Sequence, residues 1–127
     1  MTLRHTNARA LGAAVFAVIL TAPLHGTSTD RYTSHLTFGG AVALPHVTLQ
    51  AGTYVFERIF AGAPDVVVVR SLDGRTVYFM APTQPTVRPR SLAANQVVTF
   101  GEARRGLPRP IAAWYPPGAD LGYAFVY

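Results

Sequence analysis

Short apolar segments rich in Val, Tyr, Phe and Thr recur along residues 36–127, separated by Gly, Pro and Asp. Many of these segments alternate apolar and polar positions, which is the period of a β-strand with one buried face. None shows helical spacing over three turns. Strands are predicted in 35–44, 51–60, 65–72, 75–82, 96–103, 110–115 and 122–127. The pattern therefore predicts an all-β fold, a small and mostly antiparallel sandwich or open barrel of about seven strands.

The sharpest local signal is Asp73-Gly74, which stands between two β-rich segments. This dipeptide is typical of a two-residue type I′ turn, because both central positions of that turn need a positive φ. The resulting register places Leu72 opposite Arg75, Arg70 opposite Val77, and Val68 opposite Phe79. Val67, Val69, Tyr78 and Met80 would share the other face. We expect this hairpin to be central and covered on both faces.

The flanking segments carry their own turn signals. Segment 35–44 is expected to bend at Gly39-Gly40 and to end in a turn at Pro45. In segment 51–60, Tyr54 and Phe56 share one face, and Glu57 and Arg58 interrupt opposite faces. Residues 82–95 contain three prolines and are predicted to form a loop.

The N-terminus has the pattern of a secretory signal peptide. Arg4 and Arg9 precede an apolar run from Leu11 to Ala22, and small residues follow. We predict a helical signal peptide over 1–26, a flexible arm over 27–35 and one sandwich domain over 36–127. The mature protein would be exported, periplasmic or extracellular, with no stable transmembrane span. An uncleaved anchor is the alternative, although the run is short for a bilayer.

Composition narrows the chemistry further. The 127 residues include no Cys, and all eleven basic residues are Arg, so a disulfide, a thiolate nucleophile and a Schiff-base lysine are excluded. Without residues 1–26 the chain keeps nine Arg against six acids, a net charge of +3. This mild charge is compatible with an anionic glycan or lipid surface of the envelope as partner. Nucleic acid is not expected as a partner.

No motif predicts catalysis or a cofactor. The mature chain has only His35 and His46 and no G-x-S-x-G, so it lacks the pattern of a nucleophilic triad. Its acids fall in no metal-binding spacing. Glu57 and Glu102 are the only glutamates in predicted strands, and thus the only pair to consider for glycoside hydrolysis. We therefore expect no catalytic residue, no metal and no cofactor.

Arginines cluster near the C-terminal end, and Trp114 and Tyr115 follow them. Guanidinium groups bind carboxylate, sulfate or phosphate and stack on aromatic rings. The candidate ligand-binding residues are Arg88, Arg90, Arg104, Arg105, Arg109, Trp114 and Tyr115. The alternative is that the arginines are solvated loop residues with Glu102 paired locally. Trp114 is interpreted as a core residue ahead of a ligand platform.

Several phrases occur together in a familiar order: "ALPHVTLQAGTYVFE", "VVVVRSLDGRTVYF", "RPRSL", "FGEARRG", "PIAAWYPPG" and "GYAFVY". Over residues 38–127 the chain resembles an uncharacterised family of small exported β-rich proteins from environmental, acidobacterial-type bacteria. The resemblance implies export and a β-rich fold, and it implies no reaction. Some members carry a histidine and an acid in the closing motif, where this chain has Tyr123 and Ala124.

Together these patterns predict an exported, non-catalytic binding or structural module of the envelope or periplasm. Two alternatives remain. A small secreted hydrolase would need an acid pair or a histidine site gathered in one pocket. An outer-membrane-associated β protein would need a continuous apolar belt, and the alternating aromatic residues at the C-terminus are its one sequence signal.

Overall fold

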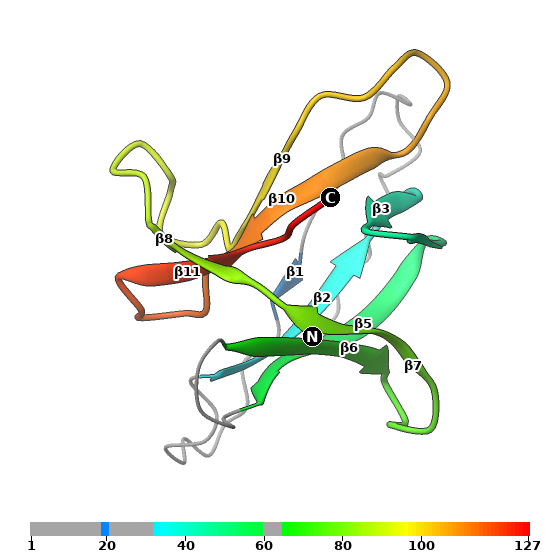
Figure 1. Ribbon diagram of the computed structural model, residues 1–127, viewed down its shortest axis with the longest axis horizontal. Helices are drawn as coiled ribbons and strands as arrows, with labels where there is room; N and C mark the ends of the chain where they lie inside the picture. The colour runs from blue at the N-terminus through cyan, green and yellow to red at the C-terminus, as the bar shows by residue number, and fades with distance from the viewer. Residues whose placement is uncertain (1–18, 21–31, 60–64) are drawn as a thin grey trace.

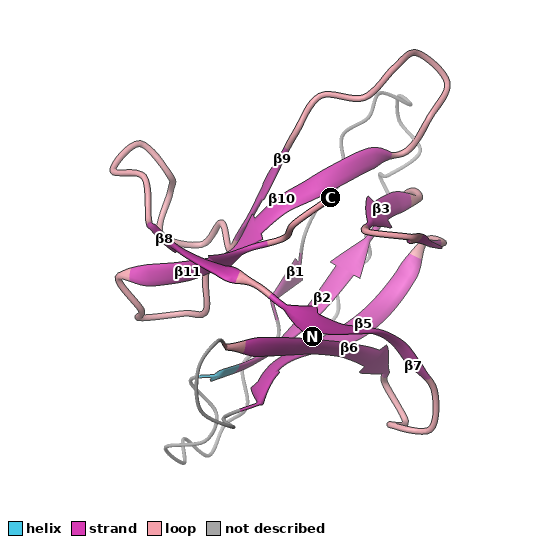
Figure 2. Ribbon diagram, in the orientation of Figure 1, coloured by secondary structure: helices cyan, strands magenta, loops and turns pink. Residues whose placement is uncertain are grey.

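The computed structural model describes residues 19–20, 32–59 and 65–127. These residues form two β-sheets that pack face to face (Figures 1 and 2). The first sheet has the strand order β1-β2-β5-β6-β7. Its strands are β1 (Ile19–Leu20), β2 (Thr33–Phe38), β5 (Gly52–Ile59), β6 (Val66–Ser71) and β7 (Val77–Pro82). All neighbouring strands in this sheet are antiparallel.

The second sheet has the order β4-β3-β10-β11-β8, and β9 also pairs with β10. Its strands are β3 (Val42–Leu44), β4 (Val47–Leu49), β8 (Gln84–Val87), β9 (Val98–Phe100), β10 (Arg109–Trp114) and β11 (Leu121–Ala124). Among the described strands of this sheet, only the β3–β10 pair is parallel. The all-β, mostly antiparallel sandwich is therefore confirmed, and the two sheets do not close into one barrel.

The structure describes eleven strands where the sequence predicted about seven. Segment 35–44 accounts for part of the difference, because the bend at Gly39-Gly40 carries the chain from the first sheet (β2) into the second (β3). A tight turn at Pro45-His46, with His46 at φ 66°, then adds β4. Strand β8 lies in the segment predicted to be a loop, where it pairs with β11.

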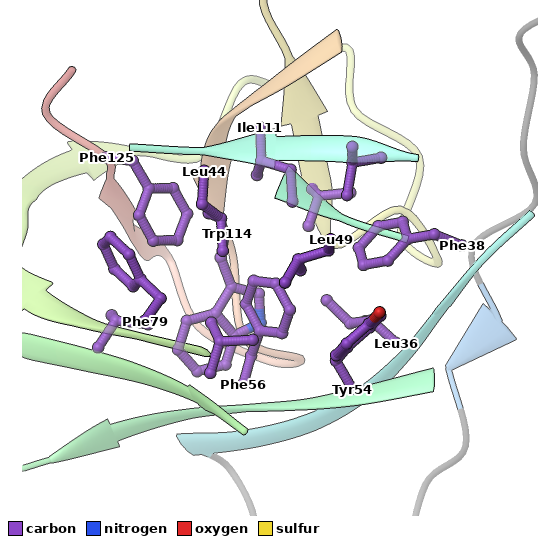
Figure 3. Packing of buried hydrophobic residues seen from close by; sticks show 14 of the residues in the cluster. Leu36, Phe38, Leu44, Leu49, Tyr54, Phe56, Phe79, Ile111, Trp114 and Phe125 are labelled. Carbon is purple, nitrogen blue, oxygen red and sulfur yellow. The ribbon is translucent and has the colours of Figure 1, made fainter. Parts of the chain in front are cut away.

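The core fills the space between the sheets, as Figure 3 shows. Strand alternation supplies it: Leu36, Phe38, Tyr54 and Phe56 point inward from the first sheet and meet Ile111 and Trp114 from the second. Phe56 packs on Trp114 with ring centroids 5.9 Å apart. Trp114 is 0% exposed, and its Nε1–H donates to Ser34 Oγ over 3.1 Å. This hydrogen bond joins the two sheets inside the core.

The β6–β7 hairpin forms, but its predicted turn and register are partly wrong. Arg70 does face Val77, whereas Phe79 faces Val69 and Met80 faces Val68 because the register shifts next to Arg70. Among the described residues only His46 and glycines have a positive φ, so Asp73 does not adopt the type I′ conformation. Its carboxylate instead accepts hydrogen bonds from Ser71 Oγ and the Arg75 N–H.

The register shift also changes which side chains are buried. Phe79 turns into the core with Val67 and Val69, while Met80 is exposed. Strand β7 is the edge of its sheet, so the hairpin is neither central nor covered on both faces along its whole length.

Of the segment predicted to be a helical signal peptide, only Ile19–Leu20 is described, and it forms strand β1 against Leu36 and Thr37 of β2. The rest of that prediction lies outside the described residues. Strand β2 begins at Thr33, inside the predicted arm. Within the described part of the chain, no helix has the length and apolarity needed to cross a membrane.

Candidate anion-binding loop

The connection between β9 and β10 and the first two residues of β10 form a closed loop, residues 101–110, here called the basic loop. At its base the Gly101 N–H donates to the Pro110 carbonyl over 2.8 Å. At its tip the Leu107 N–H donates to the Arg104 carbonyl over 3.0 Å, and Gly106 has φ 84°. A four-residue turn with a positive φ at its third position is typical of a type II turn, which favours glycine there. Backbone bonds therefore hold the loop at both ends.

The side chains of the basic loop are left to solvent. Arg104 and Arg105 are exposed, and neither guanidinium has a hydrogen bond or an ion pair among the described residues. Glu102, the one acid in the loop, is exposed and likewise forms no ion pair with the described part of the chain. Local pairing of Glu102 with the arginines, expected in the alternative interpretation, is not observed.

Arg109 and Phe100 lie at the base of the basic loop, where both line one hollow. The Arg109 guanidinium carbon lies 5.0 Å from the centre of the Phe100 ring, which is the range of a cation–π contact. A shallow, open hollow of about 590 Å³ extends from this pair to Arg104 and Leu107. The hollow thus combines two guanidinium groups with an aromatic ring and an exposed leucine.

Arg88 and Arg90 do not join this group. They belong to the β8–β9 loop, residues 88–97, which leaves the opposite end of β9 from the basic loop (Figure 1). The Arg88 Nη2 donates to the carbonyls of Ala93 and Gln96 over 2.7 and 2.9 Å. Arg88 therefore organises its own loop, and Arg90 is exposed on that same loop. The predicted single cluster of five arginines is corrected to three in the basic loop and two elsewhere.

Trp114 and Tyr115 are buried and contribute no surface to a ligand. Trp114 is a core residue, as the sequence favoured. Tyr115 lies against Gly122, where an added Cβ would clash with the Tyr115 ring and stand 2.7 Å from the Trp114 carbonyl oxygen. The Arg88 guanidinium carbon lies 5.8 Å from the Tyr115 ring centre. Both aromatic residues are thus removed from the list of ligand-binding candidates.

The two predicted strand glutamates are not brought together. Glu57 lies in β5 of the first sheet, where Oε1 is 3.3 Å from Arg70 Nη2. Glu102 lies in the basic loop beside the second sheet, outside any strand. His35 is on β2, and His46 is exposed in the β3–β4 turn. Within the described residues, no group of three His, Asp or Glu side chains could hold a metal ion.

A second polar cluster, centred on Arg58, was not predicted as a site. The Arg58 Nη1–H donates to Tyr123 Oη over 3.0 Å and lies 3.9 Å from Asp65 Oδ1. The Arg58 guanidinium also stacks 3.9 Å from the Tyr32 ring centre. Burial raises the pKa of the Tyr123 hydroxyl, although the hydrogen bond from Arg58 acts in the opposite direction.

The sequence held a signal for this cluster. Arg58 shares the face of β5 with Tyr54 and Phe56, so strand alternation directs it inward. A charged side chain that points into a core needs partners, and here they come from both sheets. We assign Arg58 a structural role, because its guanidinium ties β5 to Asp65, which directly precedes β6, and to Tyr123 of β11.

Comparison of the chain with models of protein families, with curated proteins and with solved structures finds no match. The functional interpretation therefore comes from the residues of the chain themselves. The resemblance to an exported β-rich family stays a prediction.

Proposed function

We propose that the chain is an exported, non-catalytic binding module that attaches to an anionic component of the cell envelope through its basic loop. The observation that carries this proposal is a closed loop with three arginines and one acid, in which Arg104 and Arg105 have no partner among the described residues. Exposed guanidinium groups with free donors can bind sulfate, phosphate or carboxylate in a bidentate manner.

Other arginines of the chain have structural roles that Arg104 and Arg105 lack. Arg88 donates to carbonyls of its own loop, and Arg70 forms an ion pair with Glu57. The basic loop is held by backbone bonds at its base and tip, so its conformation does not require Arg104 or Arg105. Like charges on neighbouring residues repel each other, and an anionic partner would relieve that repulsion.

The test compares two double variants with the same net charge. Arg104→Gln/Arg105→Gln removes two charges from the basic loop, and Arg75→Gln/Arg90→Gln removes two exposed charges from other loops. Binding is measured to dextran sulfate and to phosphatidylglycerol vesicles. At about 1 kcal/mol for each arginine near an anionic surface, the first variant should bind about 25-fold more weakly. The second should lose much less.

Two results would contradict the proposal. If the protein binds neither probe, the proposal of an anionic partner is wrong. If both double variants lose the same affinity, binding depends only on net charge and not on the basic loop. Increasing salt should weaken the binding, because exposed charges are screened over about 8–10 Å at physiological ionic strength.

A further inference from the structure

We propose that the partner of the basic loop is a lipid bilayer with anionic headgroups, and that Leu107 enters its surface. This inference rests on the proposed function and names the class of partner. It is carried by the position of an exposed leucine among the arginines of the loop.

Leu107 lies at the tip of the basic loop and is 59% exposed. The turn from Arg104 to Leu107 places this leucine two residues after Arg105. An exposed leucine gains free energy when it leaves water for hydrocarbon, and a hydrated polyanionic glycan offers no comparable medium. A loop that binds only a charged polymer would gain nothing from an apolar residue at its tip.

The charged residues of the loop have the distribution that a bilayer surface requires. Arg104 and Arg105 precede the leucine and Arg109 follows it, so guanidinium groups flank the apolar tip in the sequence. Long arginine side chains can keep their charged ends at the headgroups while their methylenes lie deeper. The Phe100 ring under Arg109 adds an aromatic surface at the base of the hollow.

Glu102 carries a negative charge in the basic loop, so its effect on binding should be opposite to that of the arginines. It is exposed and unpaired among the described residues, so near an anionic surface it is repelled. Glu102→Gln should therefore strengthen binding to anionic vesicles by a few fold. No strengthening by this variant would count against contact of the loop with the anionic surface.

The test uses protein purified from the envelope of the producing cells, with the N-terminus fixed by intact mass. All variants are thus compared in one processed form. Binding is measured by co-sedimentation with phosphatidylcholine vesicles, with vesicles that also contain phosphatidylglycerol, and with dextran sulfate beads. The emission of Trp114, which lies in the core, shows whether each variant keeps its fold.

Leu107→Ser is compared with Leu72→Ser, a matched control because Leu72 is also 59% exposed but lies in the β6–β7 loop. Leu107→Ser should weaken binding to the anionic vesicles about tenfold and leave binding to dextran sulfate unchanged. Leu72→Ser should change neither.

The outcomes separate this inference from the proposed function. The bilayer proposal would be wrong if the two leucine variants had equal effects on vesicle binding, or if the arginine-dependent binding were to dextran sulfate alone. Either result would leave the proposal of an anionic partner intact. Arginine-dependent binding to neither anionic probe would overturn both. Equal binding to neutral vesicles would overturn the requirement for anionic headgroups.

Discussion

Ser34→Ala should destabilise the fold through the hydrogen bond that joins the two sheets. Trp114 Nε1–H donates to Ser34 Oγ over 3.1 Å, and neither residue is more than 1% exposed. Removal of the hydroxyl leaves the indole N–H buried without its acceptor, and such a donor costs about 1–3 kcal/mol. We expect the free energy of unfolding to fall by about 2 kcal/mol.

The assay is urea unfolding followed by far-UV circular dichroism, since the companion variant Trp114→Phe removes the only tryptophan. Ser91→Ala deletes the same hydroxyl from an exposed loop and should change the free energy by less than about 0.5 kcal/mol. In the Trp114→Phe background, Ser34→Ala should cost much less, because the indole N–H is already absent. The double-mutant cycle should therefore show a coupling of about 1–2 kcal/mol.

Two results would refute this reasoning. Ser34→Ala could unfold at the same urea concentration as Ser91→Ala, which would mean that the indole N–H loses nothing. Equal costs in the tryptophan and phenylalanine backgrounds would mean that the hydroxyl acts through packing and not through the hydrogen bond.

Three further variants test other parts of the structure. The Tyr127 hydroxyl lies 2.7 Å from the Ile111 carbonyl and 3.0 Å from that of Ala43, so Tyr127→Phe should cost about 1 kcal/mol in urea unfolding at pH 7. Burial raises the pKa of Tyr127 to about 12, so its stabilising effect is complete below pH 10 and is lost as pH rises toward 12. The decline of stability over that range should be shallower in Tyr127→Phe, and an identical pH profile would contradict this. Gly122→Ala should cost more than about 3 kcal/mol, or prevent folding, because the new Cβ meets the Trp114 carbonyl as well as the Tyr115 ring; a normal melting temperature would disprove the close approach. Arg88→Gln should speed limited proteolysis within the β8–β9 loop by freeing the carbonyls that Arg88 holds, whereas Arg104→Gln should leave the cleavage rate there unchanged.

The inner faces of the sandwich could be predicted because strand alternation is a local property. Tyr54 and Phe56 were placed on one face from spacing alone, and both are buried. The transfer of the chain between sheets at Gly39-Gly40 could not be predicted, since a bend does not specify which strand pairs next. The parallel pairing of β3 with β10 joins segments more than sixty residues apart, and no local pattern encodes it.

The hairpin register failed for a different reason. Asp-Gly predicts a two-residue turn, but the Asp73 carboxylate bonds to Ser71 and Arg75 and supports a longer turn. Arg70 still faces Val77 as predicted, but Val69 faces Phe79, so β7 holds one extra residue between these two pairs, and this irregularity turns Phe79 inward. Burial of a phenylalanine is worth about 1.5–3 kcal/mol, which exceeds the preference for one turn type over another.

The candidate site was predicted in part. Arg104, Arg105 and Arg109 are neighbours in both sequence and space, so their grouping followed from the sequence. Arg88 and Arg90 were included because they are close in sequence, but β9 sends the two loops in opposite directions (Figure 1). In an extended strand, residues that are close in sequence can be far apart in space. Even a short strand separates the loops at its two ends by its full length.

Arginines that stabilise this fold donate hydrogen bonds to acceptors of the chain, and arginines available for binding do not. Arg58 reaches Asp65 and Tyr123, and Arg88 reaches the carbonyls of its own loop, so replacing either one leaves acceptors of the chain unmatched. Arg104 and Arg105 have no such acceptors among the described residues. Exposed substitutions without partners usually change stability by less than about 0.5 kcal/mol. The charge of the basic loop can therefore be removed from a protein that stays folded, and a loss of binding in that protein would report on recognition alone.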